Sequence, residues 1–82
     1  MMIPTIHLNG TSRIALLAAH MEAGRKLRAA IDALRETAPH GRDYYPQGNG
    51  AISVAMREYQ SRLDRLQGVL KELQDIAEAI DA

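Results

Sequence analysis

The chain has 82 residues, of which 46% are hydrophobic, 24% charged and 4% aromatic; this is typical of one small domain and too short for a multidomain enzyme. Ten basic residues balance ten acidic ones, so net charge gives no reason to expect a nucleic acid or an anionic membrane as partner. The absence of cysteine excludes a disulfide scaffold, a thiolate zinc site and a cysteine nucleophile. The longest apolar run, Ile14 to Ala19, has six residues, whereas a membrane span needs about 20. No basic and apolar leader opens the chain, and we expect a cytoplasmic protein.

The first two predicted segments are an extended arm and a helix. The arm covers residues 1–11 and ends at the Asn9-Gly10 turn signal. The helix is expected over residues 12–38, because Thr11 or Ser12 offers a capping hydroxyl and a proline follows the last apolar position. The apolar residues of the arm, which we expect to cover the end of the second helix, are Ile3, Ile6 and Leu8.

The last two segments are a loop over residues 39–49 and a second helix over residues 50–82. The loop holds two prolines, two glycines and an asparagine, a composition that favours turns. In the second helix, apolar residues alternate steps of four and three, which is the period of a left-handed supercoiled seam. The candidates for an oligomer interface on this seam and beside it are Met56, Tyr59, Leu63, Leu66, Val69, Leu70, Leu73 and Ile76.

Both predicted helices carry further features at regular spacing. Gln60, Gln67 and Gln74 border the seam, either as a solvated edge or as hydrogen-bonding groups at a helix contact. Gly24 interrupts the first helix, which indicates a close backbone approach, a kink or simple tolerance. The first helix also has a second apolar face, made of Leu16, Ala19, Ala23 and Ala30. A second apolar face on each helix requires further neighbours.

The segments assemble into an all-α, antiparallel helical hairpin. A short loop would place Ile14 opposite Leu73, so that the last turns of the second helix extend beyond the first helix. A domain of this size without a disulfide or a metal is marginally stable alone. We therefore expect a homodimer that forms a four-helix bundle.

The loop contains the most concentrated recognition chemistry in the chain. Two of the three tyrosines are adjacent there and lie beside an arginine, and both residue types are enriched at protein-binding hot spots. In the alternative interpretation, one tyrosine plugs the end of the bundle while the charged pair ties the turn together. The candidate partner-binding residues are Arg42, Asp43, Tyr44, Tyr45 and Pro46.

Other kinds of site have little support in the sequence. The three histidines, at positions 7, 20 and 40, lack partners at metal-ligand spacing. No phosphate-binding loop or nucleophile motif is present, so we expect neither an enzyme nor a cofactor. The only basic cluster, formed by Arg25, Lys26 and Arg28, is a solvated helix face or, in the alternative reading, a nucleic-acid surface like that of ROP-type hairpin dimers.

Two stretches carry a resemblance to a known group of proteins. These are Ile6-His7-Leu8-Asn9-Gly10-Thr11-Ser12, together with Ala38-Pro39 and Gly41-Arg42-Asp43-Tyr44-Tyr45-Pro46-Gln47-Gly48. They resemble small uncharacterised proteins of tailed bacteriophages and prophages, which have an arm, a helix, a Tyr-Tyr-Pro loop and a second helix. The resemblance implies a location in the bacterial host cell and a phage or host protein as partner, and it implies no activity.

Overall fold

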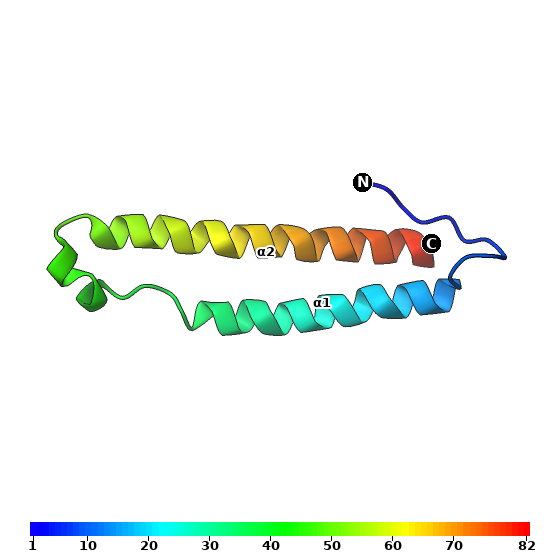
Figure 1. Cartoon of the computed structure of the whole chain (residues 1–82), viewed down its shortest axis with the longest axis horizontal. Helices are drawn as coiled ribbons and strands as arrows, with labels where there is room; N and C mark the ends of the chain where they lie inside the picture. Colours follow the sequence, from blue (N-terminus) through cyan, green and yellow to red (C-terminus); the bar gives the residue numbers. More distant parts are fainter.

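A computed structural model describes all residues, 1–82, and consists of two long helices that pack antiparallel (Figure 1). Two short 3₁₀ helices lie in the connection between them. The elements in chain order are α1 (Arg13–Arg35), η1 (Gly41–Asp43), η2 (Tyr45–Gln47) and α2 (Ala51–Asp81). This arrangement confirms the predicted all-α helical hairpin. Neither helix combines the length and the apolar character needed to cross a membrane.

Helix α1 begins where the sequence predicts and ends earlier. The Ser12 hydroxyl accepts a hydrogen bond from the Ala15 backbone N–H at 3.1 Å, which is a standard N-cap. The helix ends at Arg35, so the prediction of a helix to Ala38 is three residues too long. The Thr37 hydroxyl donates to the Leu34 carbonyl at 2.6 Å, and residues 36 and 37 bond three residues back, a tightening common at helix ends.

Two glycines with positive φ direct the chain into α2. Gly48 has φ 96° and ψ 174°, and Gly50 has φ 95° and ψ −13°. A side chain at either position would strain the backbone, although no atom lies within 4 Å of a Cβ built there. The sequence indicates a turn in this region, and these two angles explain why glycine is needed there.

Substitution of Gly48 by alanine should therefore lower the free energy of unfolding by about 1–3 kcal/mol, because an alanine cannot adopt this backbone without strain. The matched control is Gly68→Ala, in the middle of α2, where φ is not positive and nothing lies within 4 Å of the added Cβ. That change should stabilise the protein by about 0.5–1 kcal/mol, since alanine is the better helix former. Urea unfolding followed by circular dichroism measures both; equal effects of the two changes would contradict this explanation.

The pairing of the helices differs from the predicted register. A Cβ built on Gly24 would contact Leu70 Cδ1 at 3.7 Å, whereas the predicted register placed residue 64 opposite Gly24. The prediction that Ile14 lies opposite Leu73 is wrong for the same reason. Because η1 and η2 lengthen the connection, the unpaired turns of α2 are the first ones, beside the loop, and not the last ones (Figure 1). Gly24 is buried at this contact, and an added Cβ would meet Leu70 at an ordinary van der Waals distance.

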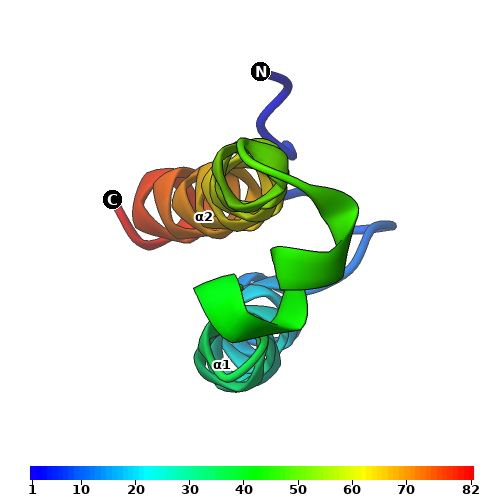
Figure 2. The ribbon, with the colours of Figure 1, turned by 90° about the vertical axis from the view of Figure 1, so that its left-hand side faces the viewer.

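The core of the hairpin is small. Only 6 of the 82 residues are buried, and Ile31, Tyr59 and Leu63 form the one cluster among them. The end-on view in Figure 2 shows a single layer of two helices, with overall dimensions of 61 × 21 × 18 Å. A pair of helices can bury only one stripe of each, so much apolar surface stays exposed.

The N-terminal arm folds back beside the last turns of α2 (Figures 1 and 2). Ile80 is 4% exposed at this end of the hairpin, while Ile3 and Ile6 of the arm stay exposed at 39% and 41%, although much less than Leu8. The placement agrees with the prediction that the arm covers the end of the second helix. Leu8 does not take part in this packing, because it is fully exposed in the turn before Gly10.

Candidate interaction surfaces

The loop between the helices is held in shape by backbone hydrogen bonds. The N–H groups of residues 43, 44, 47 and 48 each donate to the carbonyl three residues earlier, at 3.0–3.3 Å. Arg42 and Asp43 are both exposed and form no ion pair, so the idea that they tie the turn together has no support in the contacts. Their charges stay available to a partner.

The two loop tyrosines occupy different environments. Tyr44 is half-buried at the junction of η1 and η2, and η2 packs against α2. Tyr45 is 78% exposed, with Cε1 3.8 Å from a Cβ built on Gly41. The next residue, Pro46, is also exposed. The two interpretations of the tyrosine pair therefore apply to different residues: Tyr44 packs on the hairpin, and Tyr45 faces solvent.

The hairpin has two broad faces of different character. Shallow grooves on one face are lined by Met21 and Arg28 of α1 together with Gln67 and Gln74 of α2, and we call this the Gln67 face. By helical spacing, the opposite flank of each helix forms the other face. We call it the Val69 face, and its residues are Leu16, Ala23 and Ala30 of α1 with Val69 and Ile76 of α2.

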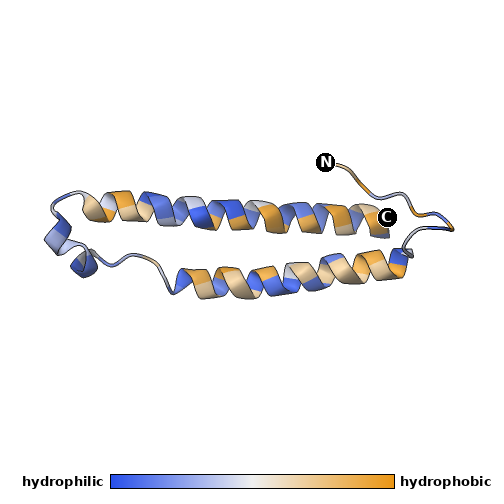
Figure 3. Ribbon diagram, in the orientation of Figure 1, coloured by the Kyte–Doolittle hydropathy of each residue, from blue (hydrophilic) through white to orange (hydrophobic).

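The Val69 face is apolar along the middle of the hairpin. Val69 is 46% exposed, Ile76 and Leu16 are half-buried, and the two alanines are exposed. Figure 3 shows apolar residues recurring along both helices. On the Gln67 face the exposed apolar side chains Ile14, Met21 and Met56 are separated by charged and amide groups. Gln60 there donates to Asp64 of its own helix at 2.8 Å, as expected for a solvated edge.

Most of the predicted seam is used inside the chain. Tyr59 and Leu63 are buried against Ile31, and Leu66 and Leu70 pack on this cluster. Leu73 is half-buried and lines a groove with Gly24. The candidates that remain open to a second chain are Met56, Val69 and Ile76.

The basic cluster on α1 is partly neutralised by one carboxylate, that of Glu22. The Arg25 guanidinium donates to both Glu22 carboxylate oxygens at 2.7 and 2.9 Å, and Lys26 Nζ lies 3.7 Å from the same carboxylate. The hydrogen bond from Arg25 lowers the pKa of Glu22, and the same bond raises the pKa of Arg25. Arg28, the third member, has no ion pair. This arrangement favours the solvated-face interpretation.

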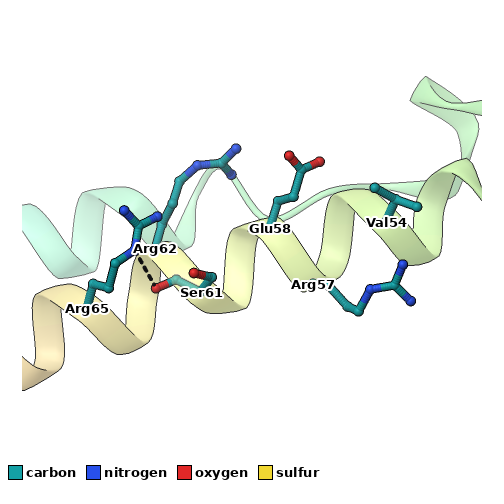
Figure 4. Close-up of a pocket in the computed structure, with 6 residues that line it drawn as sticks. All are labelled: Val54, Arg57, Glu58, Ser61, Arg62 and Arg65. Carbon is teal, nitrogen blue, oxygen red and sulfur yellow. Dashed lines mark hydrogen bonds between the residues drawn. The ribbon is translucent and has the colours of Figure 1, made fainter.

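Sequence reasoning missed a second basic group, on the outer side of α2. Arg57, Arg62 and Arg65 lie along two turns with Glu58 among them (Figure 4). None of the three arginines is in an ion pair, and Arg62 does not pair with Glu58 although the two residues are four apart on one helix. Arg65 Nε donates to the Ser61 carbonyl at 3.2 Å. The signal in the sequence was the excess of arginines at spacings of three and five between residues 57 and 65.

The remaining polar groups do not gather into a reactive site. No three or more histidine, aspartate or glutamate side chains lie close enough together to hold a metal ion. His20 Nδ1 donates to the Leu16 carbonyl at 2.8 Å, while His7 and His40 are exposed at opposite ends of the hairpin. The grooves are shallow and open, and the surfaces that stand out are the loop, the two faces and the basic group of α2.

No protein-family model, curated protein or solved structure matches this chain.

Proposed function

We propose that the protein is a non-enzymatic, homo-oligomeric interaction module that presents its loop to another protein. The observation that carries the proposal is the imbalance between the small core and the exposed apolar surface. Six buried residues are few for a stable chain of this length. An interface between copies on the Val69 face would add the missing apolar burial, and homodimers commonly use such faces.

The loop supplies the recognition part of this proposal. Tyr45 presents a large exposed ring beside Pro46, and the Arg42 charge is unpaired nearby. Exposed aromatic and arginine side chains on a turn fixed by backbone hydrogen bonds are suited to bind a protein surface with little loss of backbone entropy. The resemblance of this stretch to phage and prophage proteins supports a phage or host protein as the partner.

Substitution of Tyr45 by alanine should abolish capture of this partner while the helix content and the oligomer mass stay unchanged, because the Tyr45 ring is exposed. Tyr44→Ala is the matched control one residue away; it should lower the free energy of unfolding by about 1–3 kcal/mol, since its ring is half-buried. Affinity capture from an infected or lysogenic host, read beside circular dichroism, measures both. Unchanged capture by the Tyr45 variant would contradict a recognition role for the loop.

A nucleic-acid regulator of the ROP type is the second candidate, and the unpaired arginines of α2 are the observation that favours it. Unneutralised arginines on one helix side can contact phosphates. Purified protein should then carry nucleic acid that is lost at high salt, and Arg62→Glu with Arg65→Glu should abolish this binding. The ratio of absorbance at 260 and 280 nm measures it; a ratio typical of protein alone favours the first proposal.

A further inference from the structure

The Val69 face leaves open how two copies would be oriented. Two hairpins that meet face to face can have their loops at the same end or at opposite ends, and both arrangements keep all neighbouring helices antiparallel. With the loops at the same end, α1 of each copy packs on α2 of the other. With the loops at opposite ends, each helix packs on its own equivalent. The flanking charges and the apolar residues distinguish these two cases.

Along the middle of the hairpin, the flank of the Val69 face carries a basic residue on α1 and an acidic residue on α2. Lys26 lies between Ala23 and Ala30 in α1, and Glu72 lies between Val69 and Ile76 in α2. By helical spacing, each points away from the other helix of its own chain. Lys26 has only a distant contact with Glu22, at 3.7 Å, and Glu72 has no ion pair. Glu72 is thus unpaired, and Lys26 shares the single Glu22 carboxylate with Arg25, so both charges can pair with a charge on a second copy.

The pairing of α1 with α2 inside the chain determines where Lys26 and Glu72 lie along the long axis of the hairpin. Gly24 packs on Leu70, and Met21 shares a groove with Ala77, so the part of α2 level with Lys26 is residues 68–72, and Glu72 lies at the end of this range. A two-fold axis parallel to the helices relates the two copies without changing the position of any residue along the helix direction. It therefore brings Lys26 of one copy to Glu72 of the other, twice in the dimer.

The same operation matches the apolar residues. It brings the small side chains of Ala23 and Ala30 in one copy within about one turn of the larger Ile76 and Val69 of the other. Small residues opposite large ones allow the helices to approach evenly at the usual spacing. Arg62, which takes the place of an apolar residue in this row, then lies level with the last turns of the facing α1, because its neighbour Leu63 packs with Ile31 inside the chain.

The opposite orientation cannot satisfy charges and packing together. A register that sets Val69 against Ile76 of the second copy brings the two Glu72 carboxylates to the same level. A register that pairs Arg65 with Glu72 instead sets Arg62 against Ile76 of the second copy. Like charges at one level and a guanidinium on an apolar side chain both disfavour association.

We propose that the protein forms a dimer through the Val69 face with both loops at the same end, paired through Lys26 and Glu72. This inference rests on the proposed homo-oligomer and adds its orientation. Two Tyr45 rings and two Arg42 guanidiniums then form one composite, bivalent surface at the loop end. The arms lie together at the other end, away from this surface. A partner with two copies of its binding segment would gain avidity from such a surface.

A spin label at Gln47→Cys tests the orientation, because the chain has no other cysteine and Gln47 is exposed in the loop. Electron double-resonance spectroscopy should give a label distance of roughly 10–30 Å, since neighbouring helices pack about 8–10 Å apart. Loops at opposite ends would give a distance approaching the 61 Å length of one chain and would overturn this inference alone. A monomer with no distance peak would overturn the proposed oligomer as well.

Exchange of the two charges provides a second readout. Glu72→Lys should weaken the dimer several-fold because two lysines then meet, and adding Lys26→Glu to the same chain should restore the dissociation constant. Glu78→Lys is the matched control, since Glu78 lies on the Gln67 face and should leave the constant unchanged. If the double variant is no tighter than Glu72→Lys alone, the pairing is wrong.

Discussion

Leu63→Ala should lower the free energy of unfolding by about 2–5 kcal/mol, the usual cost of removing a buried leucine side chain. Leu63 is 9% exposed and packs with Ile31 and Tyr59 in the only buried cluster. In a hairpin with so small a core, a loss of this size removes most or all of the stability. Far-ultraviolet circular dichroism at rising urea concentration should show the helices melting early or absent at the outset.

Met56→Ala is the control for this change. Met56 lies on the same helix and is 42% exposed, so its truncation should cost less than about 1 kcal/mol. If both variants unfold at the same urea concentration, the packing of α2 on α1 does not depend on the cluster around Leu63. Such a result would require a different contact surface between the helices.

Val69→Asp should convert the oligomer to a monomer. Val69 is 46% exposed in the single chain, so the change leaves the hairpin core intact, but in a dimer it would bury an unpaired carboxylate from each copy. Burying such a charge costs several kcal/mol, and the dissociation constant should rise by at least about 100-fold. The stability of the helices should fall with it, since folding and association are linked.

Gln67→Asp is the matched control for the interface. It places the same charge one half-turn away, on the Gln67 face, and should leave the oligomer mass unchanged. Light scattering after size separation measures both variants. If Gln67→Asp dissociates the oligomer and Val69→Asp does not, copies associate through the opposite face from the one proposed here.

Much of the fold follows from the sequence because its signals are local. Three such signals are the regular spacing of apolar residues in α2, the N-cap at Ser12 and the proline after α1. Each depends only on residues close together in the sequence. The register depends instead on the length of the connection. The connection contains two turns of 3₁₀ helix and two glycines with positive φ, and composition alone does not reveal them. The residue opposite Gly24 is therefore Leu70 and not the predicted residue 64.

The candidate sites follow from the sequence in part. Residue types identify the Tyr-Tyr-Pro loop as a candidate binding site. Because the two tyrosines have the same chemistry, only their packing in the structure shows that Tyr44 is half-buried and Tyr45 is exposed. The basic cluster on α1 looks open in the sequence, and its neutralisation depends on the rotamers of Glu22 and Arg25. The arginines of α2 are hard to recognise as a basic group from the sequence, because Glu58 lies four residues before Arg62, a spacing at which ion pairs are common, and this pair does not form in the structure.

Sedimentation equilibrium of the purified wild-type protein over a range of concentrations tests most directly whether the hairpin needs a second copy. The chain mass is 9.0 kDa, and we expect a single species of twice that mass, with helix content falling only when dilution dissociates it. A cooperatively folded monomer at the highest concentrations would contradict the oligomer and leave the Val69 face without the partner assigned to it.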